Sequence, residues 1–236
     1  MQLFFNNSLT EHSDVFQFEK NESRHISKVL RKSNGDILHI TNGKGWMFEA
    51  QILEADIKSV RAKIIKKTFE KDKEYQLHMA VAPTKSMDRF EWFLEKATEI
   101  GVSEITPIVC DNSERKVIKI DRLERIVLSA VKQSLKRYIP KINNAISLDE
   151  FLKTEQNSLK YIAHCAEGNK RNLYHAAPAN SNITILIGPE GDFSSNEIEE
   201  ALMRNYQAVT LGNSRLRTET AALAACHTIA LINALN

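Results

Sequence analysis

The feature that most constrains the fold is an alternation of apolar strands and amphipathic helices that begins near Tyr75. Short apolar runs are separated by longer stretches with helical spacing; the runs are YQLHMAVAP, ITPIVC, KYIAHCA, ITILIG and AVTLG. The clearest helix is SMDRFEWFLEKATEIG, in which Phe90, Phe93, Leu94 and Ala97 share one side. Such alternation predicts an α/β fold with a mostly parallel sheet covered by helices. In sheets of this kind, ligands bind at the carboxyl ends of the strands.

Further helices are expected in DRLERIVLSAVKQSLKRY, from about Ser195 onward, and in the Ala-rich segment near the C-terminus. The first seventy or so residues have a different pattern, in which the strands ILHIT, WMFEAQIL and VRAKIIKKTF follow one another. Asn42-Gly43 between the first two of these runs predicts a hairpin. We therefore expect two domains, a small β-rich module over residues 1–72 and an α/β domain over residues 73–236.

A basic helix is predicted ahead of this hairpin. The stretch NESRHISKVLRKSNGD is typical of one short helix that ends near Asn34-Gly35. Its basic residues follow helical spacing along one face, at Arg24, Lys28, Arg31 and Lys32. Most charged helix faces are only solvated surface. A row of Lys and Arg can also bind nucleic acid by displacing phosphate counterions, so both interpretations stay open.

The loop GPEGD follows the buried strand ITILI and precedes a helix whose start, Ser194 and Glu197, has capping-box spacing. Glycine and proline here are also typical of an ordinary tight turn. A phosphate-binding loop would need a lysine or at least no acids, so Glu190 and Asp192 argue against that ligand. Carboxylates beside bare backbone suit a ligand with a cationic centre and ribose hydroxyls.

A second loop, LGNSRLRTETAAL, follows the next strand. Thr218 or Thr220 can cap the last helix, which explains the threonines. A helix start does not explain Arg215 and Arg217, because positive charge is disfavoured just before a helix N-terminus. These arginines are expected to serve a ligand or a neighbouring chain.

Several function classes are disfavoured by the composition. The three cysteines, Cys110, Cys165 and Cys226, and the seven histidines show no metal-ligand spacing, so a reduced, cytoplasmic, metal-free protein is expected. The start of the chain does not resemble a signal peptide. The most apolar segment, TAALAACHTIALINAL, is shorter than a bilayer span and is interrupted by His227 and Asn233, so it is expected to be a buried helix and no membrane partner is expected.

Charge is distributed unevenly along the chain, although the formal net charge is only +2. Residues 114–141 hold nine Lys or Arg against three acids, or about +6, whereas residues 188–236 hold three Arg against six acids, or about −3. One surface can therefore face a polyanion while another prefers a cation.

Three sequence motifs, which follow one another along the chain, resemble those of a known family. IGPEGDFSSNE and LGNSRLRTETA, preceded by KSMDRFEWFLEKATEIGVSEITPIVCDNSERK, resemble the motifs of the SPOUT methyltransferases, specifically the 16S ribosomal RNA uracil-N3 methyltransferase family. ESRHISKVLRKSNGD and ITNGKG are similar to the N-terminal PUA-like barrel of that family, so the likeness covers nearly the whole chain. The resemblance implies a C-terminal trefoil knot, S-adenosylmethionine as cofactor, a homodimer, and 16S ribosomal RNA of the small ribosomal subunit as partner.

The resemblance also implies site residues. Groups that would hold S-adenosylmethionine belong to the two loops: Ile187, Gly188, Pro189, Gly191, Leu211, Gly212, Leu216 and Thr218. Uracil N3 must lose a proton while its carbonyl oxygens take up negative charge. Our candidates for stabilising that charge are Arg217 and Arg115. Our candidates for accepting the proton are Glu219 or Glu190. Lys85 joins the basic row of the N-terminal helix as an expected RNA contact.

The chain departs from the family pattern in KQSLKRYIP, where Lys132 replaces an acid and Lys136 replaces an arginine. Two other functions stay open at this stage. One is methylation of a different RNA base or of a ribose 2′-oxygen. The other is a ribosome-assembly protein that binds RNA through the barrel without catalysis.

Overall fold

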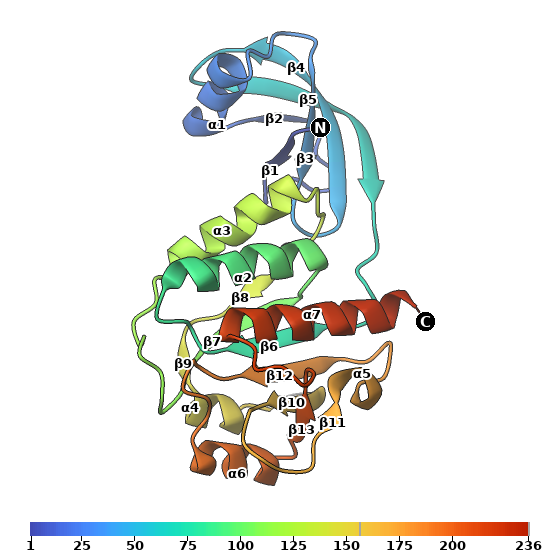
Figure 1. Cartoon of the computed structure of the whole chain (residues 1–236). Coiled ribbons are helices and arrows are strands. Elements are labelled where there is room, and N and C mark those ends of the chain that lie inside the picture. The colour runs from blue at the N-terminus through green and yellow to red at the C-terminus, as the bar shows by residue number, and fades with distance from the viewer. Residues whose placement is uncertain (156, 236) are drawn as a thin grey trace. The chain divides into compact units, whose positions relative to one another are not determined.

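The computed structural model describes residues 1–155 and 157–235, and the chain forms two compact units (Figure 1). The β-rich unit consists of Met1–Asp72 together with Val131–Ile139. The parallel-sheet unit consists of Lys73–Ala130 and Pro140–Asn236.

The parallel-sheet unit is built on the strand–helix alternation of the sequence. Its strands are β6 (Leu77–Val81), β7 (Glu104–Val109), β8 (Lys141–Ile142), β9 (Ile146–Ser147), β10 (Leu159–Ala163), β11 (Arg171–Asn172), β12 (Ile183–Ile187) and β13 (Gln207–Thr210). They lie in the order β11-β13-β10-β12-β6-β7-β8, and β9 pairs with β7. All these pairs are parallel, which confirms the predicted sheet. Every residue of β12 is buried, as expected for a strand with helices on both faces.

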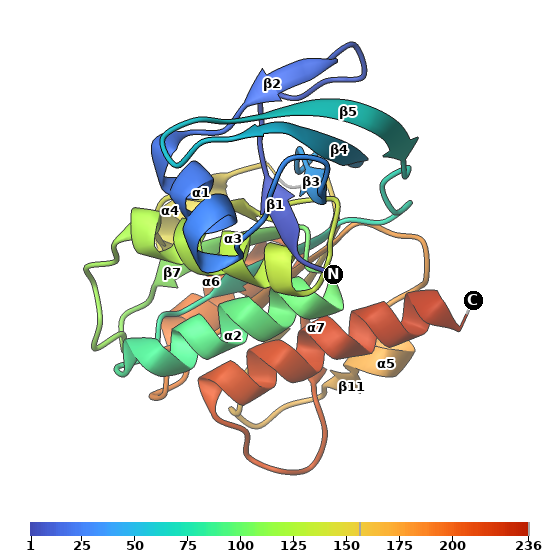
Figure 2. The same ribbon diagram turned by 90° about the horizontal axis from the view of Figure 1, so that it is seen from above.

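Helices cover both faces of this sheet. The helices that follow β6 in the chain are α2 (Met87–Ile100), α3 (Ile120–Gln133), α4 (Leu148–Lys153), α5 (Leu173–Ala176), α6 (Ser195–Met203) and α7 (Thr218–Ala234), and the end of α3 belongs to the β-rich unit. Helices α2 and α7 lie side by side on one face, and α4 and α6 lie on the other (Figures 1 and 2). Helix α2 ends where predicted, because Gly101 takes φ 114° and donates its N–H to the Ala97 carbonyl.

The β-rich unit holds a five-stranded sheet in the order β1-β3-β4-β5-β2. Its strands are β1 (Leu3–Phe5), β2 (Val15–Gln17), β3 (Ile37–Thr41), β4 (Trp46–Ala55) and β5 (Val60–Phe69). The predicted hairpin is confirmed, since β3 and β4 pair antiparallel across the turn at Asn42-Gly43. The Asn42 side chain accepts the N–H groups of Lys44 and Trp46, and Gly43 and Gly45 take positive φ angles.

The predicted helix in NESRHISKVLRKSNGD is shorter than expected. Helix α1 covers Lys20–Arg24, a π-helical turn η1 covers His25–Val29, and Arg31 is left-handed with φ 54°. The π-turn carries a hydrogen bond from the Leu30 N–H to the His25 carbonyl. The prediction of a helix to Asn34-Gly35 was therefore wrong, because the chain must turn early enough to enter β3.

Helix α3 also ends earlier than the predicted DRLERIVLSAVKQSLKRY, at Gln133. Leu135 is left-handed with φ 57°, and the Lys136 N–H bonds to the Val131 carbonyl and closes the helix. The following residues pair with the β3–β4 turn: the Gly45 N–H donates to the Arg137 carbonyl at 3.0 Å. This pairing joins residues 131–139 to the β-rich unit, an arrangement that helical periodicity alone does not reveal.

Candidate active site

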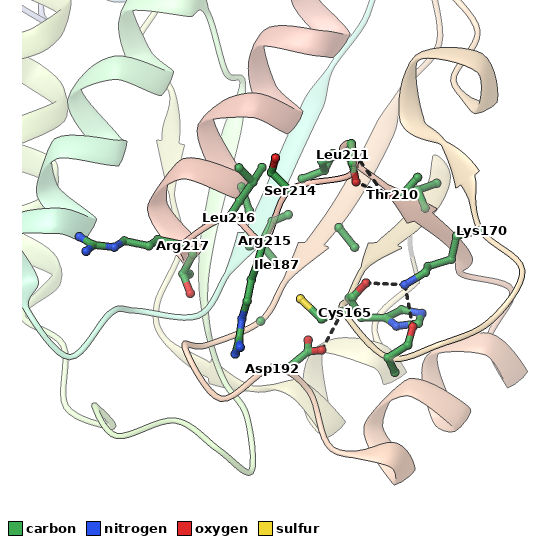
Figure 3. A pocket seen from close by; sticks show the side chains of 18 of the residues that line it. Cys165, Lys170, Ile187, Asp192, Thr210, Leu211, Ser214, Arg215, Leu216 and Arg217 are labelled. Carbon is green, nitrogen blue, oxygen red and sulfur yellow. Dashed lines mark hydrogen bonds between the residues drawn. The ribbon is translucent and has the colours of Figure 1, made fainter.

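Three neighbouring parallel strands end at one edge of the large sheet. Strand β10 lies between β13 and β12, so the loops that follow these three strands come together. They enclose a cavity of about 820 Å³, and Figure 3 shows the side chains that line it. This is the edge at which the alternating pattern predicted a ligand.

Most of the residues expected to hold a cofactor line this cavity: Ile187, Gly188, Pro189, Leu211, Gly212, Leu216 and Thr218. Gly191 is not among the lining residues; a Cβ there would lie 3.1 Å from the Asn112 Cβ. Gly188 has a packing reason to be glycine, because a Cβ there would approach the Phe193 ring to 3.0 Å.

Asp192 ties two of the loops together. Its Oδ2 accepts the Cys165 N–H at 2.7 Å, and its Oδ1 accepts the Phe193 N–H at 2.9 Å. Its backbone is left-handed with φ 63°, which aspartate tolerates better than most residues. The loop then enters α6 through the predicted capping box of Ser194 and Glu197. Asp192 therefore holds an acidic group at the wall of the cavity.

Glu190, Lys85 and Arg115 meet at the loop that follows β6. The Glu190 carboxylate accepts the Lys85 N–H at 2.9 Å. Arg115 donates from Nε and Nη2 to the Lys85 carbonyl at 3.2 and 3.0 Å. Lys85 Nζ lies 2.8 Å from the Glu114 carboxylate, which raises the pKa of the lysine. Glu190 lines the cavity, whereas Arg115 does not and fixes the β6 loop.

Arg217 stands at the start of α7 and is exposed. It is the N-cap residue and the helix has no side-chain cap, so the expectation of a threonine cap was wrong. Thr218 instead starts the helix, is buried and lines the cavity. Figure 3 shows Arg215 and Arg217 pointing in different directions, with Arg215 toward the side of Asp192. Within residues 1–155 and 157–235, the Arg217 side chain has no hydrogen bond or ion pair, so it is available to a substrate.

Glu219 lies away from the cavity. It is only 8% exposed, and its Oε1 lies 4.0 Å from Arg89 Nε on α2. Its Oε2 is buried and has no hydrogen-bond partner among the described residues. Glu219 is thus placed at the α2–α7 contact and does not line the pocket.

Sequence reasoning missed the third wall of the cavity, the loop after β10. This loop contributes Ala163, His164, Cys165, Ala166 and Lys170. Lys170 Nζ donates to the carbonyls of His164 and Ala166, at 2.9 and 2.6 Å, and so closes the loop (Figure 3). The signal available in the sequence was only its position after a predicted strand.

The His164 ring is unusual in this wall. Both of its nitrogens are buried and neither has a hydrogen-bond partner within the described part of the chain. Burial lowers the pKa of His164, and Lys170 lowers it further, while Asp192 acts in the opposite direction. The imidazole is therefore neutral at neutral pH.

The residues expected to contact RNA are divided between the units. Arg24, Lys28 and Arg31 are exposed and Lys32 is half-buried in the β-rich unit. Lys85 lies in the parallel-sheet unit. Lys132, which departs from the family pattern, forms an ion pair with Glu22 at 2.6 Å. Glu22, which lies in the β-rich unit, therefore compensates the positive charge of Lys132.

Two further features are absent from the described residues, a metal site and a membrane-spanning helix. No group of three or more His, Cys, Asp or Glu there is arranged to hold a metal ion. No helix in residues 1–155 or 157–235 has the length and apolar character needed to cross a membrane.

Comparison with known proteins gives the family. Residues 71–230 match the model of an RNA methyltransferase domain, and residues 18–65 match that of an RNA methyltransferase PUA domain. The chain is 30% identical over 236 residues to ribosomal RNA small subunit methyltransferase E of Rickettsia conorii, an alignment that covers 98% of this chain and 95% of that protein.

Solved structures agree along the whole chain. A probable rRNA-methyltransferase from Porphyromonas gingivalis superposes with a TM-score of 0.91 at 40% identity, over 100% of this chain and 99% of the other. A ribosomal RNA small subunit methyltransferase E from Neisseria gonorrhoeae, bound to S-adenosyl methionine, superposes with a TM-score of 0.86 at 27% identity, over 99% and 98%. The chain therefore belongs to the RNA methyltransferase family that carries an N-terminal PUA domain.

Proposed function

We propose that this protein transfers a methyl group from S-adenosylmethionine to N3 of a specific uridine in 16S ribosomal RNA of the small ribosomal subunit. The observation that carries the proposal is the cavity at the carboxyl ends of β10, β12 and β13, which is lined by glycines and by the carboxylates of Glu190 and Asp192. The family motifs quoted above lie on two of its three walls. The names of the relatives support the ribosomal substrate, and the bound ligand of the Neisseria structure supports the cofactor.

The cavity fits the cofactor by volume and by chemistry. At about 820 Å³ it lies within the range of roughly 300–1,000 Å³ that is typical of small-molecule sites. Gly212 lines the cavity, and a Cβ there would meet nothing within 4 Å, so its main-chain groups can approach a nucleoside closely. The carboxylates of Glu190 and Asp192 are suitable neighbours for a sulfonium cation. When bound, S-adenosylmethionine supplies a methyl group that is activated by the positive sulfur.

The chain's own residues must then position the uracil and manage its charge. Arg217 is the first candidate to stabilise negative charge on the uracil carbonyl oxygens, because the residue lines the cavity and its side chain is exposed. We assign Arg115 a supporting part, since it holds the Lys85 carbonyl. Glu190 is the better placed of the two proposed proton acceptors, because it lines the cavity while Glu219 does not. Removal of the N3 proton through water is also consistent with this position.

RNA binding is proposed for the PUA-like domain of residues 1–72, which makes up most of the β-rich unit. Its exposed basic residues Arg24, Lys28 and Arg31, with the half-buried Lys32, supply charge for phosphate contacts. Lys85, at the edge of the cavity loops, would contact RNA close to the reacting base. Residues 73–236 would bind the cofactor and perform the transfer.

The family resemblance supports three further features. We propose that the C-terminal chain is threaded into a trefoil knot, that the protein is a homodimer, and that it acts in the cytoplasm. Each cofactor site would be completed by the partner chain. The Ala-rich helix α7 supports the dimer, because its leucines Leu223 and Leu231 are half-buried and exposed, respectively.

A nucleoside survey tests the function. Ribosomal RNA from a strain lacking this protein would be digested to nucleosides and compared with wild-type RNA by mass spectrometry. Loss of 3-methyluridine from 16S RNA alone is the expected result. Loss of another methylated base or of a 2′-O-methyl ribose would favour the related methyltransferase activity, and unchanged nucleosides would favour a non-catalytic assembly protein.

A further inference from the structure

His164 is a buried polar group for which the protein provides no partner. It directly follows β10, and its carbonyl is fixed by the Lys170 ammonium at 2.9 Å. The ring lines the cavity, yet neither nitrogen has a hydrogen-bond partner among the described residues. Buried polar atoms in folded proteins nearly always have a partner, and exceptions call for a ligand, a water or a functional role.

We propose that His164 binds S-adenosylmethionine as a neutral imidazole, with one ring nitrogen donating a hydrogen bond to the cofactor and the other accepting one. This inference rests on the proposed cofactor. A neutral imidazole offers one donor and one acceptor. Ribose hydroxyls and the adenine edge present both kinds of group, whereas an ionised phosphate presents only acceptors.

The charge of the ring decides whether this interaction is favourable. A protonated imidazolium would place a second cation in the cavity beside the sulfonium and would lose its acceptor nitrogen. Burial and the Lys170 ammonium keep the pKa of His164 below its ordinary value of 6.5, against the opposing effect of Asp192. The other charged groups that line the cavity are Arg215, Arg217 and Glu190. The ring is therefore ready to bind without losing a proton at neutral pH.

A dependence of cofactor affinity on pH follows. Below the pKa of His164 the free protein carries a proton on the ring, and this proton must leave when the cofactor binds. The affinity should thus fall by about tenfold per pH unit below that pKa and stay constant above it. The effect should appear as the pH falls below 6.5, because the pKa of His164 is lowered from that ordinary value.

The test is calorimetric titration of the full-length protein with S-adenosylmethionine across this pH range. His164→Phe keeps a flat ring and removes both nitrogens. His164→Asn keeps one donor and one acceptor without a titrating proton. His175→Phe is the matched control, because His175 is an exposed histidine of the same unit that does not line the cavity.

At pH 7.5, we expect H164F to weaken binding about tenfold, as for the loss of two neutral hydrogen bonds, and H164N to recover most of the affinity. Both variants should lose the additional pH dependence below 6.5, while H175F should keep it. Wild-type affinity and pH dependence in H164F would overturn the proposal. If H164F does not fold, as judged by circular dichroism, retention of the wild-type pH dependence in H164N would overturn it instead.

If the proposed function itself were wrong, the calorimetric result would differ from the outcomes expected for the His164 variants. In that case the wild-type protein itself would not bind S-adenosylmethionine at any pH.

Discussion

Glu190 and Asp192 both bring negative charge to the cavity, but their hydrogen bonds differ. Both Asp192 oxygens accept backbone N–H groups, so its loss would also loosen the loops. Within the described part of the chain, Glu190 accepts one N–H, that of Lys85. Its charge can therefore be removed with little structural consequence, because an amide oxygen can accept the same hydrogen bond.

We predict that Glu190→Gln weakens binding of S-adenosylmethionine by about three- to fivefold, as expected for one exposed charge near a cation. S-adenosylhomocysteine has no sulfonium charge, so its affinity should change less. Isothermal calorimetry with both ligands measures the difference. Glu199→Gln, the same change at an exposed site on α6 outside the cavity, is the control. Equal losses for the two ligands would show that Glu190 does not act through the sulfonium charge.

Arg217 is predicted to act on the reaction rather than on cofactor binding. Arg217→Ala should lower kcat for methyl transfer by about 100-fold, the usual loss when one donor to a developing negative charge is removed. The dissociation constant for S-adenosylmethionine should stay within about twofold of wild type in the same variant. Arg217→Lys keeps the charge but not the fork of donors, so partial recovery is expected. A normal kcat in Arg217→Ala would exclude this role.

The sequence identified the cavity residues that lie on recognisable loops and missed those that do not. Gly188 and Gly212 were found because glycine marks a turn after a strand. His164 was missed because the loop AHCAEGNK has no glycine–proline or paired-charge pattern. Glu219 was expected near the reaction, but successive residues of a helix point about 100° apart. Since Thr218 faces the cavity, Glu219 is turned toward α2 and Arg89.

Two elements of the β-rich unit show where periodicity is insufficient. The spacing of Arg24, Lys28 and Arg31 assumed 3.6 residues per turn, but the chain adopts a π-turn from His25 to Val29. All three side chains are nevertheless exposed. In α3, apolar spacing continues past Gln133 although the helix ends there, because later residues pair with the β3–β4 turn. Long-range pairing of this kind has no local signature in sequence.

The exposed basic residues Arg24, Lys28 and Arg31, which lie in or just after α1 and the π-turn, give a test of RNA binding. Charge reversal by Arg24→Glu with Arg31→Glu should leave S-adenosylmethionine binding intact and weaken RNA binding. Each lost phosphate contact should remove about one unit from the slope of log affinity against log salt. Filter binding of 16S RNA over a salt series measures both effects.

The same charge change at Lys58→Glu with Lys63→Glu, two exposed lysines elsewhere in the β-rich unit, is the matched control. Because phosphate contacts position the RNA without specifying the base, the methylated atom should not change. Wild-type methylation of small-subunit particles at physiological salt in the Arg24 and Arg31 variant would mean that this surface is only solvated. RNA binding would then have to be sought in residues 114–141.

At the level of the whole molecule, alternation of strands and helices predicted the parallel sheet correctly but not its strand order. Strand β10 lies between β12 and β13, although it precedes both in the chain. This order brings three loops to one cavity, and it depends on crossovers that composition does not encode. The sequence motifs therefore predicted the loops after β12 and β13 as walls of the cavity. The loop after β10 was recognised as the third wall only from the strand order of the structure.

Assembly is a second property of the whole molecule. We expect a homodimer by light scattering at micromolar concentration, because α7 presents Leu231, which is 40% exposed. Leu231→Glu should shift the protein toward monomer, since it would bury a charge in an apolar interface. Leu202→Glu, on α6 and 44% exposed, is the control and should remain dimeric. A fully active wild-type monomer would contradict a site completed by the partner chain.

The most direct test is methyl transfer by the purified protein to small ribosomal subunits from a strain that lacks it. The subunits would be incubated with isotopically labelled S-adenosylmethionine, and the RNA digested to nucleosides for mass spectrometry. We predict one labelled 3-methyluridine per 16S RNA with the wild-type protein, and about 100-fold slower labelling with Arg217→Ala. Absence of label, or label in another nucleoside, would contradict uridine N3 methylation by this protein.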